Sequence, residues 1–150
     1  MLATVIAVLG TLLGAVVAGF IQHRTTRAAR NAERADRHRD QALEAVTALA
    51  SALANHRRTQ FIREELRLAG ADQTRQEAAR AELHATRAAI ETPRVLVAIL
   101  LPALAPVADA AAQASYGLRD ATDTDTLAAR RQDAIGATKA FVAAAARHFA

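Results

Sequence analysis

Residues 2–21 read LATVIAVLGTLLGAVVAGFI, and this segment decides how the rest of the chain is interpreted. It has no charged side chain, and Thr4 and Thr11 are its only polar residues. Twenty helical residues extend about 30 Å, which matches the hydrocarbon thickness of a bilayer. A buried helix of a soluble domain normally keeps one polar face, and a cleaved signal peptide normally begins with basic residues. We therefore predict a single transmembrane anchor over residues 1–22, with those two segment types as the alternatives.

The next segment is strongly basic. Six arginines lie between Gln22 and Arg39, against the two acidic residues Glu33 and Asp36, so the net charge of +4 is concentrated beside the apolar segment. Basic flanks resist translocation and stay on the cytoplasmic side of a membrane. The predicted location is the cell membrane, single-pass, with the N-terminus outside and residues 22–150 in the cytoplasm.

Five of these arginines share one helix face, because a helix turns about 100° per residue. They are Arg24, Arg27, Arg30, Arg34 and Arg37. We expect residues 23–42 to form a basic juxtamembrane helix whose arginine face contacts anionic lipid headgroups. Nucleic-acid phosphates are a less favoured partner, since no aromatic residue lies among the arginines to stack on bases. An ordinary solvated helix face is the third interpretation.

A stripe of small residues follows a 3–4 spacing through the apolar segment and beyond it. Its members are Thr4, Ala7, Thr11, Gly14, Ala18, Ile21, Thr25, Ala28, Ala32, Ala35, Arg39, Ala42, Val46, Leu49 and Leu53. Alternating steps of three and four place one narrow stripe along a supercoiled helix, and small side chains let two membrane helices approach closely. The motif Gly10-x-x-x-Gly14 adds to this pattern, so Ala7, Gly10, Gly14 and Ala18 are the predicted self-association residues of a homo-oligomer. Abundant alanine could also produce such a stripe by chance.

Residues 43–150 are predicted to form an antiparallel bundle of three to four helices, which makes the fold all-α. The first helix carries Leu43, Val46, Leu49 and Leu53 on one face and should end at Gly70. The spacing of Thr74 and Glu77 predicts a capping box at the start of the second helix, and Pro93 predicts its end.

The segment Val95–Leu101 is the most apolar part of this region and is bounded by Pro93 and Pro102. We expect a short, deeply buried helix there, with a re-entrant membrane segment as the alternative. A further helix should cover about residues 103–118. The last helix should follow a turn at Arg119–Asp125. The residues that repeat at helical spacing along it, and so should face the core, are Leu127, Arg131, Ala134, Ile135, Thr138, Phe141, Val142, Ala145 and Phe149.

Reactive groups are scarce. The chain has no cysteine and only 3% aromatic residues, and its five histidines never pair at helical ligand spacing. Asp123 and Asp125 are best explained as helix-capping residues, and Glu64 and Glu65 as a charged helix surface. His56 continues the stripe and is expected to be half-buried. We therefore predict no enzyme activity, no catalytic residue, no metal site and no cofactor.

Four stretches together resemble a known family. They are MLATVIAVLGTLLGAVVAGFIQHRTTRAAR (1–30), ALEAVTALASALANHRR (42–58), ETPRVLVAILLPALAPV (91–107) and ASYGLRDA (114–121). These resemble the KilB-type proteins of Streptomyces conjugative plasmids over nearly the whole chain. The resemblance implies a small membrane protein that assists plasmid transfer or its spread through the mycelium, toxic when overproduced, with other plasmid-transfer proteins as partners. An alternative resemblance is to the peripheral-stalk subunit of rotary ATP synthases, which combines a membrane span with a long helix.

Overall fold

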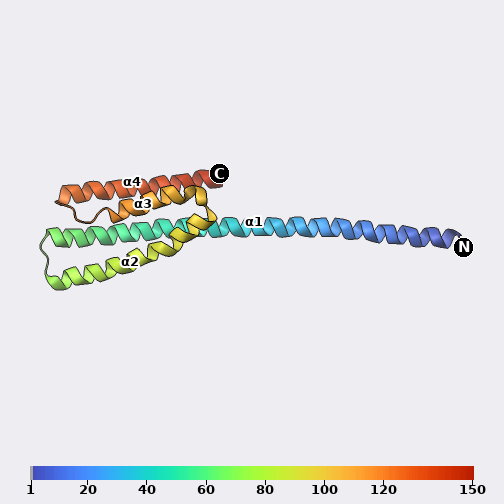
Figure 1. The fold of residues 1–150 in the computed structure, drawn as a ribbon, viewed down its shortest axis with the longest axis horizontal. Helices are drawn as coiled ribbons and strands as arrows, with labels where there is room; N and C mark the ends of the chain where they lie inside the picture. Colours follow the sequence, from blue (N-terminus) through green and yellow to red (C-terminus); the bar gives the residue numbers. More distant parts are fainter. Residues whose placement is uncertain (1) are drawn as a thin grey trace. The chain divides into compact units, whose positions relative to one another are not determined.

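The structure is a computed structural model that describes the backbone of residues 2–150 and the side chains of residues 30–150. Its elements are α1 (Leu2–Leu68), α2 (Gln73–Leu100), the short 3-10 helix η1 (Pro102–Leu104), α3 (Ala105–Tyr116) and α4 (Thr124–Phe149) (Figure 1). No strand occurs along the described backbone, so the predicted all-α fold is confirmed.

The chain divides into two units, Met1–Asp40 and Gln41–Ala150. In the second unit, the end of α1 is joined to α2 by a tight turn, and α3 is joined to α4 by a longer one (Figure 1). Both connections reverse the chain direction, so residues 41–150 form an antiparallel helical bundle (Figure 1).

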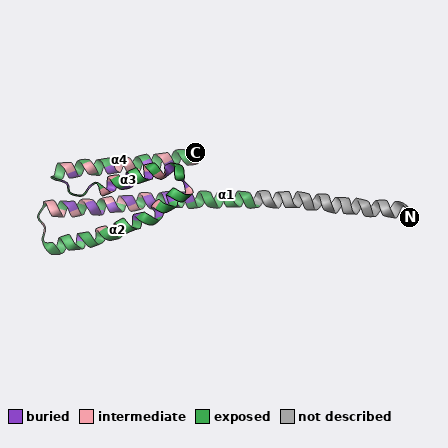
Figure 2. Ribbon diagram, in the orientation of Figure 1, coloured by how far each residue is buried: buried purple, intermediate pink, exposed green. Residues whose placement is uncertain are grey.

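All four helices contribute to the main core of this bundle. Figure 2 shows the buried positions concentrated on the inward faces of the helices. The largest buried apolar side chains of this core are Leu49 and Leu53 from α1, Ile90 and Val97 from α2, and Phe141 from α4. The fully buried residues that α3 adds to this core are alanines, which lets the helix pack closely against its neighbours, and Val107 and Tyr116 pack against the core from its edge. A smaller cluster around Leu118 and Leu127 fills the other end of the bundle.

Gly70 ends α1, as the sequence predicts. Its φ of +66° lies in the left-handed region, which costs a residue with a Cβ atom about 1–2 kcal/mol. The Ala71 amide donates to the Leu66 carbonyl at 2.9 Å, and the Gly70 amide donates to the Arg67 carbonyl at 3.2 Å. These two bonds form a Schellman motif, which satisfies carbonyls left free at the helix end.

Two glycine substitutions should therefore have opposite effects on stability. We expect Gly70→Ala to lower the free energy of unfolding by about 1 kcal/mol, because of its left-handed backbone. Gly136→Ala should raise it by about 0.5–1 kcal/mol, since Gly136 lies inside α4 and an added Cβ meets nothing within 4 Å. Urea denaturation of the two variants measures both changes. Equal effects at the two positions would contradict this assignment.

The second helix starts at Gln73, next to the predicted position near Thr74, but its predicted capping residue and its predicted end were wrong. Asp72, and not Thr74, is the N-cap, and its carboxylate accepts a bond of 3.0 Å from the Arg75 amide. Helix α2 also continues through Pro93 to Leu100. Proline removes one helical hydrogen bond, but Ile90, Pro93 and Val97 are buried on one face, and this burial holds the helical path together.

The segment 95–101 is not the deeply buried helix that its composition predicts. It forms the end of α2, where Val97 and Leu101 are buried. Val95 and Ile99 are 52% and 69% exposed, and Leu96 is also exposed. The segment is therefore a two-faced helix end, with one side in the core and an apolar side on the surface.

Among residues 30–150, whose side chains are described, no helical segment combines the length and the hydropathy that a membrane crossing requires. Residues 2–21, which carry the transmembrane prediction, lie outside the described side chains.

Candidate functional surfaces

Three of the five arginines of the predicted lipid-contacting face lie within the described side chains. Arg30, Arg34 and Arg37 are all exposed. Arg37 forms a surface ion pair with Glu33 at 3.5 Å and also donates to the Glu33 carbonyl at 3.3 Å. An exposed pair of this kind contributes little stability, so the guanidinium group stays accessible to an anion. Arg24 and Arg27 lie outside the described side chains.

The small-residue stripe is exposed in one part of α1 and buried in the part that follows. Ala32 and Ala35 are exposed, whereas Ala42, Val46, Leu49 and the residues that follow are buried in the chain's own bundle. The stripe beyond residue 41 therefore packs intramolecularly, and the prediction that it forms one continuous self-association surface is wrong for that part. The predicted self-association residues Ala7, Gly10, Gly14 and Ala18 lie outside the described side chains.

An apolar surface covers one end of the bundle. Val95, Leu96 and Ile99 of α2 are exposed. Next to them, the two helices enclose a groove of about 390 Å³. The groove is lined by Gln41, Glu44, Ala45, Ala48, Thr92, Pro93, Leu96 and Leu100. Exposed apolar side chains gathered in this way are typical of an interaction surface.

Glu64 lies in a buried polar layer, which corrects its assignment as a surface charge. Its side chain is 0% exposed, while the neighbouring Glu65 is exposed. The carboxylate accepts bonds from Arg63 at 2.6 Å, from Arg67 at 2.8 Å and from the Asp120 amide at 3.1 Å. Arg67 also donates to the Ala121 carbonyl. Glu64 thus ties α1 to the turn that follows α3.

His56 belongs to the same layer and is fully rather than half buried, at 1% exposed. Its Nδ1 lies 3.2 Å from the Thr86 hydroxyl, and that hydroxyl donates to the Leu83 carbonyl. The hydroxyl has one proton, so it accepts from His56, which places the ring proton on Nδ1. The ring also contacts Tyr116 edge to face, with centroids 5.3 Å apart.

Burial lowers the pKa of His56 to about 4, and the positive charge of Arg87 adds to this effect. The unfolded chain takes up this proton near pH 6.5, whereas the folded chain stays neutral until about pH 4. The contribution of neutral His56 to the free energy of unfolding is therefore fully present above pH 6.5. It is lost as the pH falls towards 4, by about 3 kcal/mol in total.

Comparison with His56→Gln tests this pH dependence. We expect the free energy of unfolding of the wild-type chain to fall more steeply between about pH 7 and about pH 4.5 than that of the variant, because Gln has no proton to gain. Urea titrations at several pH values measure the difference. Parallel curves would show that His56 does not titrate in this way.

The spacing of the small-residue stripe already indicated which residues form this buried polar layer. Its 3–4 spacing continues from Leu53 through His56 and Gln60 to Glu64, and the structure buries all of them. The interpretation of Glu64 as surface charge relied on its residue type and ignored its position on the stripe.

Asp123 caps α4, as predicted, through a bond of 2.7 Å from the Thr126 amide. Within residues 30–150 no group of three His, Asp or Glu side chains is placed to hold a metal ion.

The fold and these surfaces define a class of protein: a helical bundle that presents exposed apolar and basic surfaces and follows an arginine-rich helix. The family model described as KilB plasmid transfer protein matches residues 43–149. Protein KilB of Streptomyces lividans is 54% identical over 149 residues, which covers 99% of both chains. The chain belongs to the KilB plasmid transfer protein family, which confirms the resemblance drawn from the sequence. No solved structure matches the chain.

Proposed function

We propose that this protein is a non-catalytic, membrane-anchored interaction protein that assists plasmid transfer or spread. The observation that carries the proposal is the 54% identity to Protein KilB over 99% of both chains, because it includes the N-terminal segment as well as the bundle. A role in plasmid transfer is what the family description gives. The uncharged residues 2–21 and the arginines after them support the membrane anchor.

In this proposal each part of the chain has one task. Residues 2–21 cross the cell membrane with the N-terminus outside, and Ala7, Gly10, Gly14 and Ala18 bring protomers together. The five arginines from Arg24 to Arg37 contact anionic headgroups of the inner leaflet. The bundle lies in the cytoplasm and recruits other transfer proteins through the apolar surface of Val95, Leu96 and Ile99.

A mating assay tests the proposal. A plasmid lacking this gene is complemented with the full chain, with a chain lacking residues 2–21, or with Ile99→Glu. We expect the full chain to restore transfer and both variants to fail. Ile99 is 69% exposed, so its substitution leaves the core intact. The matched control is Gln113→Glu, an exposed α3 position away from the apolar surface, which should restore transfer. Full transfer by the chain lacking residues 2–21 would overturn the membrane-anchored role.

A second candidate is nucleic-acid binding through the arginine face, which the exposure of Arg30, Arg34 and Arg37 supports. It requires binding of plasmid DNA that weakens steeply with salt and disappears when the five arginines become Gln. The absence of a mobility shift at low salt would eliminate it. A plain helical stalk is less well supported, because residues 41–150 have a core of their own.

A further inference from the structure

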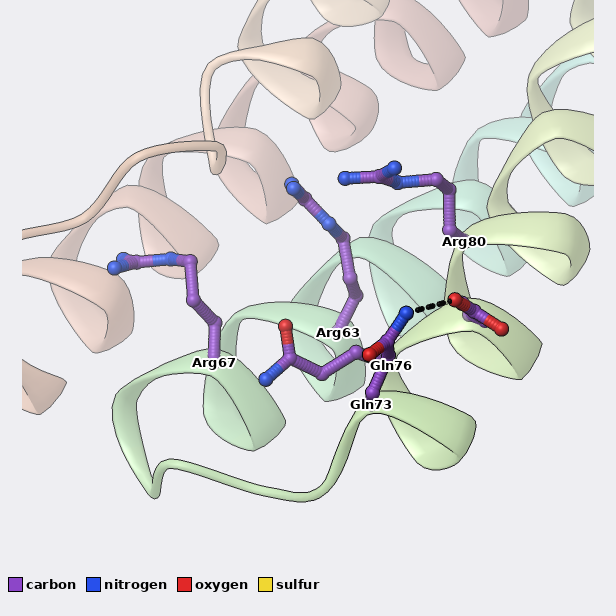
Figure 3. Close-up of a pocket in the computed structure, with 6 residues that line it drawn as sticks. Arg63, Arg67, Gln73, Gln76 and Arg80 are labelled. Atoms are coloured by element: carbon purple, nitrogen blue, oxygen red, sulfur yellow. Dashed lines mark hydrogen bonds between the residues drawn. The ribbon is translucent and has the colours of Figure 1, made fainter.

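A second arginine-rich surface lies within the bundle, separate from the juxtamembrane arginines. The end of α1 and the start of α2 enclose a pocket of about 240 Å³, lined by Arg63, Arg67, Gln73, Gln76, Glu77 and Arg80 (Figure 3). A pocket of about 170 Å³ shares Arg63 and Arg80 with it and adds Arg87 and Arg119. We call the two together the arginine groove.

The positive charge of the arginine groove is only partly neutralised. Glu64 pairs with Arg63 and Arg67, so one buried carboxylate serves two guanidinium groups. Arg80, Arg87 and Arg119 make no ion pair with any residue in the described part of the chain. Figure 3 shows Arg63 from α1 and Arg80 from α2 at the same pocket, with the end of Arg80 turned towards the Arg63 side, so like charges line one pocket. These like charges repel one another, and an anion bound between the guanidinium groups reduces the repulsion.

The groups of the arginine groove are also held in place. Glu64 fixes Arg63 and Arg67 through bonds of 2.6 and 2.8 Å, and Arg87 stacks on the Tyr116 ring at 4.5 Å. Donors that are already ordered lose less entropy when they bind a ligand. The Tyr116 hydroxyl is buried, and it has no hydrogen-bond partner among the described residues. Tyr116 contacts Arg87 and lines the second pocket, so its unpartnered hydroxyl is a further donor for an anionic oxygen.

We propose that the arginine groove binds the phosphate chain of a small polyphosphate, as in a nucleoside triphosphate. Guanidinium groups match phosphate oxygens in a planar, two-point geometry. The arginines converge from α1, α2 and the turn after α3 on two adjoining pockets, which suits phosphates joined in one compact chain. Phosphates of a nucleic-acid strand are spread along an axis and suit an extended basic stripe instead. This binding does not depend on the membrane anchor.

Calorimetric titration of the purified full-length protein with inorganic pyrophosphate tests the proposal at constant ionic strength. We expect saturable binding that Arg80→Gln weakens about tenfold, because one charge-assisted contact to phosphate is lost. The matched control is Arg58→Gln, an exposed α1 arginine outside the groove, which should change the affinity less than twofold. Arg80 makes no ion pair in the described chain, so Arg80→Gln should not lower the melting temperature below that of the wild-type protein.

Two further ligands distinguish the source of the phosphates. If adenosine triphosphate binds more tightly than pyrophosphate, with the same dependence on Arg80, the ligand of the groove is a nucleotide. If the two bind with equal affinity, the groove recognises the phosphate chain alone. Either result supports the proposal. The absence of saturable pyrophosphate binding, or equal loss in Arg80→Gln and Arg58→Gln, overturns it. Tighter binding of a single-stranded oligonucleotide that depends on Arg80 also overturns it, in favour of a strand. None of these outcomes bears on membrane anchoring, which the mating assay tests separately.

Discussion

Glu64→Ala is expected to lower the free energy of unfolding by about 3 kcal/mol, although sequence alone assigns this residue to a charged surface. The carboxylate is 0% exposed and accepts bonds from Arg63, Arg67 and the Asp120 amide. Its removal leaves two cations beside each other and a backbone N–H without its partner. Both effects cost free energy, because the two arginines, 23% and 37% exposed, are resolvated only in part, and the amide loses a charged acceptor.

The measurement is urea denaturation of the full-length protein followed by tyrosine fluorescence. The chain has one tyrosine, Tyr116, which packs against His56 and Arg87 inside the bundle and so reports on its unfolding. Glu65→Ala is the matched control, since Glu65 is the exposed neighbour on the same helix, and it should change stability by less than about 0.5 kcal/mol. Equal stability losses in the two variants would contradict the buried position of Glu64.

Phe141→Ala is expected to have the largest effect, a loss of about 4 kcal/mol in the free energy of unfolding. Phe141 is the largest fully buried side chain among the described residues, and it lies in the core shared by all four helices. Truncation to alanine removes its buried apolar surface and leaves a cavity that rigid neighbouring helices fill only in part.

The adjacent residue provides the control for this prediction. Val142 is on the same helix but is exposed, so Val142→Ala should cost less than about 1 kcal/mol. The same tyrosine-monitored denaturation compares the two variants. A Phe141→Ala protein as stable as the wild type would mean that α4 does not pack on the other helices as described.

Local signals in the sequence predicted the helix ends best. Gly70 and Asp123 were assigned correctly, because a left-handed glycine and a capping aspartate act through backbone groups only a few residues away. The capping box at Thr74 was wrong because Asp72, two residues earlier, offers a competing side chain of the same kind. Sequence spacing alone does not show which of two neighbouring capping side chains forms the N-cap.

Contacts between distant parts of the chain were predicted less well. A proline normally ends a helix, yet α2 continues past Pro93 because its neighbours Ile90 and Val97 are buried against other helices. In the same way, Glu64 is buried because the turn at Asp120, 56 residues away, supplies a partner. The arginine groove was missed for the same reason, since its arginines come from three separate segments.

Alkaline carbonate extraction of membranes measures directly whether the chain is held in the membrane. The full-length chain should stay in the membrane pellet after extraction if the proposed anchor, the 20 uncharged residues 2–21, crosses the bilayer. A chain lacking residues 2–21 should move to the supernatant, with its bundle of residues 41–150 still folded. Recovery of the full-length chain in the carbonate supernatant would contradict the membrane anchor and the function built on it.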